Sequence, residues 1–131
     1  MKKTATIVLS TLLLITGCNN VKAPLEGRSD PYSAAQIQFA DNDLRKKTAV
    51  SAPKMARDAA GLLFVTVPIR AATNYKLYVD YRFTYFDQAG QPIYQTGWMN
   101  KTLEPNVFDQ VTGNSTSPRA VDFQIDFRYA Q

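Results

Sequence analysis

Apolar and polar residues alternate along two stretches in the second half of the chain. From Leu77 to Tyr85 the odd positions are apolar or aromatic, and the even positions are mostly polar. The same alternation runs from Val121 to Tyr129. A period of two residues is typical of a strand with one buried and one solvated face. We therefore expect two long strands whose odd residues line the core.

Shorter strands and turns are predicted around these two. Leu62–Ile69 also alternates, and we expect this strand to end at Pro68 or to lie at a sheet edge, because proline cannot donate to a ladder. Asp87–Gly90 has the residues of a hairpin turn. Further expected elements are a return strand over Gln91–Trp98, a turn over Leu103–Asn106, a short strand over Val107–Val111 and a loop over Thr112–Arg119.

The segment before Leu62 is open to more than one interpretation. Gln36–Phe39 alternates like a strand, whereas Asp41 or Asp43 could cap a short helical turn over Leu44–Lys47. The chain has no long helical pattern, and its turn signals recur about every 8–12 residues. We expect an all-β domain over residues 36–131, a small antiparallel immunoglobulin-like β-sandwich of about seven strands.

The N-terminus carries an export signal. A basic start, Met1–Lys3, precedes the apolar run Ile7–Ile15, which is too short to span a bilayer core of about 30 Å. Ile15-Thr16-Gly17-Cys18 resembles the lipobox of bacterial lipoproteins. By that resemblance residues 1–17 are a signal peptide and Cys18 becomes the acylated N-terminus; the alternative is an ordinary secretory signal that ends in a cysteine by chance.

The lipid anchor implies a location. Residues 18–35 are polar and interrupted by Pro24, Gly27 and Pro31, which is typical of a flexible tether. Asn19 follows the cysteine, and in the enterobacterial type of sorting pattern an Asp at that position retains a lipoprotein in the inner membrane. We therefore expect the lipid anchor to hold the domain on the outer membrane, facing the periplasm.

Composition excludes several kinds of chemistry. The chain has no histidine, and Cys18 is its single cysteine. Serine–histidine and cysteine–histidine catalysis, disulfides and cysteine-ligated metals are therefore excluded in the acylated chain. Of the 15 Lys and Arg residues, Lys2 and Lys3 leave with the signal, so 13 basic and 11 acidic side chains give a net charge of +2. This small charge does not indicate a nucleic-acid partner, and no cofactor is expected.

Carboxylates are the remaining candidates for catalysis. Asp122 and Asp126 lie roughly 13 Å apart along their strand, beyond the roughly 5–9.5 Å that a glycoside hydrolase pair needs. Arg82 and Arg128 share the polar faces with them and with Asp80, so we expect cross-strand ion pairs. Asp41-Asn42-Asp43 is too short for a calcium loop. We predict no catalytic and no metal-ligating residue, and a carboxylate-based enzyme acting on cell-wall material remains the alternative.

Two groups of residues are candidates for partner binding. Tyr78, Tyr94 and Trp98 occupy even positions and would form an amphipathic patch if they emerged on one surface. The alternative is that Tyr94 and Trp98 are core residues that close the end of the sheet. Asn114 and Arg119 lie in the polar loop Thr112–Arg119, which could carry recognition or be a plain connector.

Two longer stretches resemble a known family. "GLLFVTVPIRAATNYKLYVDYRFTYFDQAGQPI" (Gly61–Ile93) and "SPRAVDFQIDFRY" (Ser117–Tyr129) are similar to the YcfL-like family of proteobacterial periplasmic lipoproteins. The resemblance covers about residues 36–129. It implies an immunoglobulin-like domain on a lipid anchor, no established enzymatic activity, and a gene neighbourhood that includes cell-wall synthesis. We expect a non-enzymatic envelope lipoprotein, an interaction or accessory module whose partner is an envelope protein or the cell wall.

Overall fold

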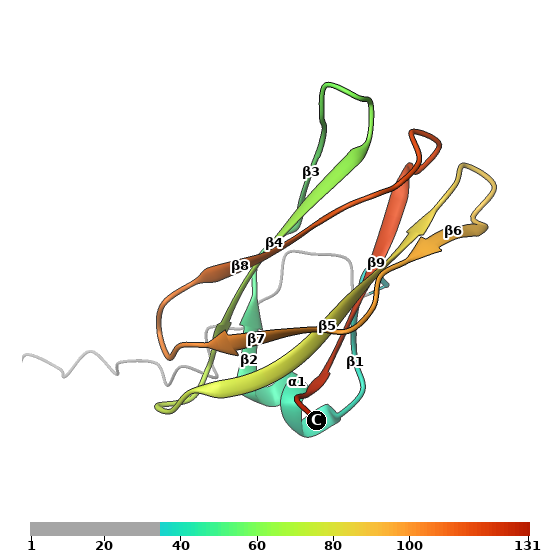
Figure 1. Ribbon diagram of the computed structural model, residues 1–131. Coiled ribbons are helices and arrows are strands. Elements are labelled where there is room, and N and C mark those ends of the chain that lie inside the picture. The colour runs from blue at the N-terminus through green and yellow to red at the C-terminus, as the bar shows by residue number, and fades with distance from the viewer. Residues whose placement is uncertain (1–34) are drawn as a thin grey trace, which may run out of the picture.

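The computed structural model describes residues 35–131, so Cys18, the predicted signal peptide and all of the predicted tether except Ala35 lie outside the described residues. The elements in chain order are β1 (Ile37–Phe39), α1 (Asn42–Lys47), β2 (Thr48–Val50), β3 (Lys54–Arg57), β4 (Leu63–Ala71), β5 (Leu77–Phe86), β6 (Pro92–Gln95), β7 (Met99–Leu103), β8 (Asp109–Asn114) and β9 (Asp122–Tyr129) (Figure 1). No helix among these residues is long and apolar enough to cross a membrane.

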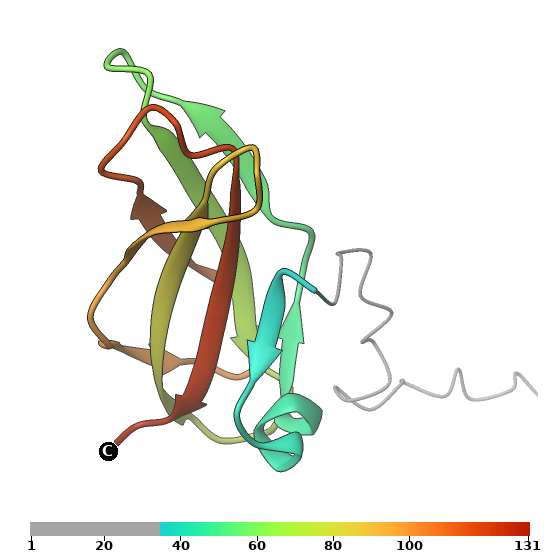
Figure 2. The same cartoon turned by 90° about the vertical axis from the view of Figure 1, so that its right-hand side faces the viewer.

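The strands form two sheets that pack face to face (Figure 1, Figure 2). In sheet A, β5 lies between β9 on one side and β6 and β7 on the other, and β1 adds to β9 in parallel. In sheet B, β4 pairs with β8 on one side and with β2 and β3 on the other. Because β2 and β3 share one side of β4, and β6 and β7 share one side of β5, the nine strands occupy seven strand positions. The predicted immunoglobulin-like sandwich is confirmed.

The core lies between the inner faces of β4, β5 and β9. The odd residues of β4 are fully or almost fully buried, and so are most odd residues of β5 and β9, as the alternation predicts. Tyr81 and Tyr129 are only partly buried, and Val121 lies just before β9 with 43% of its surface exposed. Burial of apolar area on this scale is the main stabilising contribution in a domain of this size.

The prediction that the β4 strand ends or lies at an edge near Pro68 is wrong. β4 continues to Ala71 and is the central strand of sheet B. The carbonyl of Pro68 accepts a hydrogen bond from the Ser51 amide at 3.0 Å, so the side of Pro68 that lacks an N–H faces the gap between β2 and β3. The reciprocal bond, from residue 68 to the Ser51 carbonyl, is the one that proline cannot make, and it falls where β2 ends at Val50, so the cost to the ladder is one bond.

The predicted strand over Val107–Val111 and the loop over Thr112–Arg119 are displaced. The strand is β8, Asp109–Asn114, while Val107 and Phe108 precede it and are 61% and 50% exposed. The inward position after Val111 is Gly113 rather than an apolar residue. A Cβ atom at Gly113 would lie 2.6 Å from both Phe83 and the Tyr85 hydroxyl, so the large rings of sheet A occupy the space that a side chain would fill.

The return strand is interrupted, and the N-terminal segment adopts both of the structures considered for it. The strand is broken after Gln95, and Thr96 still bonds to Phe83. The Thr96 amide donates to the Phe83 carbonyl at 2.9 Å, and the Thr96 hydroxyl accepts from the Phe83 amide at 2.9 Å. The predicted strand at Gln36–Phe39 is β1, and the predicted helical turn is α1. Asp41 occupies the N-cap position of α1, but its side chain makes no capping hydrogen bond. The hairpin turn at Asp87–Gly90 is confirmed, with Gly90 at φ +75°.

Candidate binding surface

Three loops gather at one end of the sandwich, at the top of Figure 1 and Figure 2: the β3–β4 hairpin, the β5–β6 turn and the β8–β9 loop. The β5–β6 turn is held by Asp87, whose Oδ1 accepts hydrogen bonds from the amides of Ala89 and Gln91 at 2.9 Å each. Gly90 takes the left-handed conformation that closes this turn. The carboxylate of Asp87 therefore has a fixed position at this end.

The β8–β9 loop is tied to its neighbours. Arg57, from β3, donates hydrogen bonds to the carbonyls of Gly61 at 2.8 Å, Pro118 at 3.3 Å and Ala120 at 2.8 Å. The Ser115 hydroxyl accepts a bond from the Leu63 amide at 2.9 Å, which fixes the start of the loop to β4. Side-chain bonds of this kind replace the ladder where the backbone leaves the sheet.

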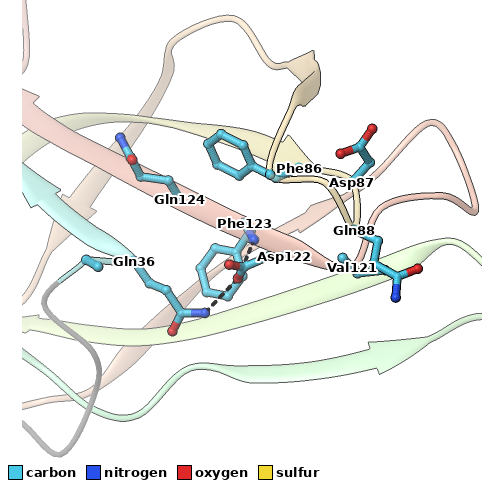
Figure 3. A pocket seen from close by; sticks show the side chains of 10 residues that line it. Gln36, Phe86, Asp87, Gln88, Val121, Asp122, Phe123 and Gln124 are labelled. Atoms are coloured by element: carbon cyan, nitrogen blue, oxygen red, sulfur yellow. Dashed lines mark hydrogen bonds between the residues drawn. The ribbon is translucent and has the colours of Figure 1, made fainter.

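Two adjoining open cavities lie beside the β5–β6 turn and the β8–β9 loop. The first has a volume of about 400 Å³ and is lined by Ala35, Gln36, Phe86, Asp87, Gln88, Gly90, Val121, Asp122, Phe123 and Gln124 (Figure 3). The second has a volume of about 420 Å³ and is lined by Asp87, Gln88, Ala89, Pro118, Arg119 and Val121. Both are lined by Asp87, Gln88 and Val121, and we call the two together the loop-end groove.

The groove combines apolar walls with polar groups. Phe86 is partly buried and Val121 is 43% exposed, so both offer apolar surface. Asp122 Oδ1 accepts bonds from Gln36 Nε2 at 3.0 Å and from the Phe123 amide at 2.8 Å. The Asp87 carboxylate also lies 3.8 Å from the guanidinium of Arg119. Each carboxylate in the groove thus already has partners, and the mixture of apolar and polar surface is typical of binding sites.

The outer face of sheet A carries a second polar cluster, centred on Trp98. Arg82 pairs with Asp126 at 3.0 Å, and Arg128 pairs with Asp80 at 3.2 Å, as the sequence predicts. The guanidinium carbons of Arg82 and Arg128 lie 4.4 and 4.0 Å from the centre of the Trp98 ring. Both cations are therefore engaged twice, by a carboxylate and by the indole ring.

Asp80 is the most buried member of this cluster. Burial by itself would raise the pKa of Asp80, but hydrogen bonds from Asn100, the Gln131 amide and Arg128 outweigh it and hold that pKa below its ordinary value. A carboxylate that stays ionised and multiply bonded is suited to a structural role rather than to proton transfer.

The three aromatic residues singled out in the sequence do not come together. Tyr78 is 58% exposed on the outer face of sheet A, two positions along β5 from Asp80. Trp98 lies on the same face but is covered by the arginines. Tyr94 is paired with Tyr85 and stacks on its ring at a centroid distance of 6.3 Å, so it lies toward the core side at the sheet edge.

The two loop residues also separate. Asn114 is the last residue of β8 and pairs with Phe64 of β4, outside the groove. Arg119 lines the groove, with 71% of its side chain exposed. Cys18 lies outside the described residues. No group of three Asp or Glu side chains that could hold a metal ion occurs among residues 35–131.

Sequence reasoning missed most of the groove. Gln36, Gln88 and Val121 come from three distant parts of the chain, and nothing in their local pattern marks them. Phe86 gave a signal, because it is an aromatic residue at an even, outward position of β5. An aromatic residue at the end of a strand next to a turn is not by itself a sign of a binding site, so this signal is weak.

Comparison with known proteins assigns the domain to a family. The family model described as "Protein of unknown function (DUF1425)" matches residues 35–129. A crystal structure of a DUF1425 family member from Shewanella sp. pv-4 is similar, with 26% identity and a TM-score of 0.58, covering 64% of this chain and 79% of that chain. The crystal structure of Campylobacter jejuni cj0090 shares the fold, with 13% identity and a TM-score of 0.60 over 73% of this chain and 99% of that chain. No curated protein matches the chain. The chain belongs to the DUF1425 family, whose function is unknown.

Proposed function

We propose that this chain is a YcfL-like lipoprotein of the cell envelope, a non-enzymatic module that binds a partner in its loop-end groove. The observation that carries the proposal is the groove itself, with apolar walls from Phe86 and Val121 and polar groups held in place by the turn at Asp87. Rigid loops at one end of a sandwich are a common setting for recognition.

The charged groups support binding rather than hydrolysis. A pair of catalytic carboxylates needs one member with a raised pKa across a cleft from the other. Asp80 and Asp126 are paired with arginines on a sheet face, and the pKa of Asp80 is lowered. In the groove, Asp87 and Asp122 accept hydrogen bonds from backbone amides. These contacts favour a binding module over the carboxylate-based enzyme.

The anchor completes the proposal. The lipobox-like stretch ending at Cys18 supports acylation of that cysteine, and Asn19 supports transport to the outer membrane. Two or more acyl chains hold a protein on a bilayer stably, whereas one chain binds only marginally. The domain would then present its groove to the periplasm, and the partner is an envelope protein or cell-wall material.

Photocrosslinking in intact cells tests the binding role. A photoreactive amino acid replaces Gln88, which lines both cavities, and in a matched control it replaces Met55, which is 51% exposed on β3 away from the groove. We expect a discrete crosslinked species from position 88 and none from position 55. The same products from both positions, or none from position 88, would contradict the proposal.

The anchor is tested separately by fractionation. Cys18→Ser should accumulate as an unprocessed or unlipidated precursor, detected by a shift in gel mobility and loss of labelled fatty acid. Asn19→Asp should move the processed protein from the outer-membrane to the inner-membrane fraction of a sucrose gradient. Membrane retention of Cys18→Ser identical to that of the parent would refute the lipid anchor.

A further inference from the structure

One edge of sheet A is incompletely paired. β1 pairs in parallel with Ile125–Phe127 of β9, and its register begins at Ile37. Residues 122–124 of β9 pair with β5 on one side, but among residues 35–131 no strand lies on their other side. An unpaired stretch of strand presents backbone donors and acceptors that another extended segment can use.

The direction of the backbone groups is known from the neighbouring bond. The Ile125 amide donates to the carbonyl of Gln36 at 2.8 Å, on the β1 side. Amides two residues apart in a strand point to the same side, so the Phe123 amide also points toward this edge. Within residues 35–131 its hydrogen-bond partner is the adjacent Asp122 side chain, at 2.8 Å, which caps it in place of a strand.

The chain's own β1 does not continue along this edge. Ala35 and Gln36 form a turn rather than a strand. The side chain of Gln36 then reaches back to Asp122, where its Nε2 donates to Oδ1 at 3.0 Å, and Figure 3 shows this bond at the border of the cavity. Side chains therefore cover the free edge of β9, and the first cavity of the loop-end groove, of about 400 Å³, is lined by the same residues.

We propose that residues 122–124 of β9 and the adjoining groove form a β-strand addition site for an extended segment of a partner protein. The Phe123 amide at this edge can donate to a backbone carbonyl of an added strand, and an extended polypeptide supplies such carbonyls at regular spacing. Alternate side chains of that segment would lie against Phe86 and Val121. This inference rests on the proposed binding function and names the chemistry of the partner.

Peptide selection on the purified full-length chain in detergent tests the site. Octapeptides selected from a random displayed library are synthesised, and their affinity is measured by fluorescence polarisation. Each peptide is then N-methylated at one backbone amide at a time. Strand addition predicts an alternating result: methylation of the amides that face β9 weakens binding about tenfold or more, and methylation of the intervening amides changes it little.

Variants of the chain locate the binding. Val121→Lys fills the groove and should weaken binding of the selected peptides at least tenfold. Met55→Lys changes a similarly exposed apolar residue on β3 and should leave their affinity unchanged. Asp122→Ala removes the cap on the Phe123 amide and should tighten binding about threefold to tenfold, because the peptide no longer displaces a hydrogen bond. Recognition of peptide side chains by Asp122 would instead weaken binding in this variant and would overturn the proposal.

The remaining outcomes are equally decisive. Selection of no peptide that Val121→Lys weakens, or a methylation series without alternation, overturns strand addition. If selection on the full chain yields no such peptide but selection on a chain lacking residues 19–34 does, the edge belongs to the protein's own N-terminal segment, and this result also overturns the proposal. The peptide selection does not depend on the lipid anchor or on a cellular partner. Strand addition can therefore fail while the crosslink from position 88 is still found, and the crosslink can be absent while the selected peptides still bind.

Discussion

The contact between Gly113 and the aromatic core gives the sharpest prediction for stability. Replacing this glycine by alanine places a Cβ atom 2.6 Å from Phe83 Cδ2, 2.6 Å from the Tyr85 hydroxyl and 2.8 Å from Phe83 Cε2. Carbon atoms in good contact lie about 3.5–4.0 Å apart, so the rings or β8 must move by roughly 1 Å. Neither ring has room, because both are fully buried and stacked on each other at 5.9 Å.

The cost follows from two opposing effects. One extra methyl group in a filled core costs about 1–3 kcal/mol through displaced side chains and backbone. Replacement of glycine by alanine restricts the unfolded chain and returns about 0.4–1 kcal/mol. We therefore expect Gly113→Ala to lower the free energy of unfolding by about 1–2 kcal/mol. In a domain of this size that corresponds to a melting temperature lower by roughly 4–15 °C.

Thermal unfolding followed by circular dichroism measures the effect. The matched control is Gly97→Ala, where an added Cβ has no atom within 4 Å, and we expect its melting temperature to stay within a few degrees of the parent. Tyr85→Phe combined with Gly113→Ala removes one of the two clashes and should recover part of the loss. If Gly113→Ala is as stable as Gly97→Ala, the close packing of β8 against β5 inferred here is incorrect.

Four further changes test other parts of the structure. The Tyr85 hydroxyl is buried without a hydrogen-bond partner among the described residues, so Tyr85→Phe should leave the melting temperature unchanged or raise it. Trp98→Ala removes the ring on which two guanidinium groups stack and should cost about 1–2 kcal/mol in urea unfolding. Arg57→Ala leaves three loop carbonyls without a donor and should speed amide exchange in residues 115–121 about tenfold, with exchange in β5 unchanged. The folded-state pKa of Asp80 lies below its ordinary value of 3.8. The stability that the ionised carboxylate contributes is therefore fully present above pH 3.8 and is lost as the pH falls through the folded-state pKa. Asp80→Asn should accordingly melt at a lower temperature than the parent at pH 7, and the two melting temperatures should converge below about pH 4.

The two long strands could be predicted because each buries one face over its whole length. Phe83 and Phe127 lie at inward positions fixed by a period of two, and no tertiary information is needed to assign them. The charged residues of the opposite face could be paired for the same reason, because Arg82 and Asp126 are cross-strand neighbours. These parts of the fold depend only on local alternation.

The errors occur where a residue's role depends on its partner strand. Pro68 is tolerated in the central strand because the one bond it cannot make falls where β2 ends, and the position of that strand end cannot be read from the Pro68 segment. The local sequence around Gly113 resembles a loop, because it has no apolar residue to bury. In the structure the rings of β5 fill the core at this position, so a strand residue without a side chain fits there. The groove is a similar case, since Gln36 and Gln88 line the same cavity only after the sandwich has formed.

The structure also changes which surface is the better candidate for binding. The sequence predicts Trp98 as part of an aromatic binding patch, but Arg82 and Arg128 cover its ring, and a partner would have to displace two ion pairs and two ring contacts to reach it. Truncating or diverting one member of such a cluster leaves a charge without its partner, which is costly at a partly buried site. At the loop-end groove, by contrast, a ligand covers the exposed surface of Val121 and has to displace only the local bonds of Asp122, one of which it can replace with its own backbone. Binding at the groove therefore gains contacts at little cost to the fold, and for this reason the proposals concern the loop end rather than the aromatic face.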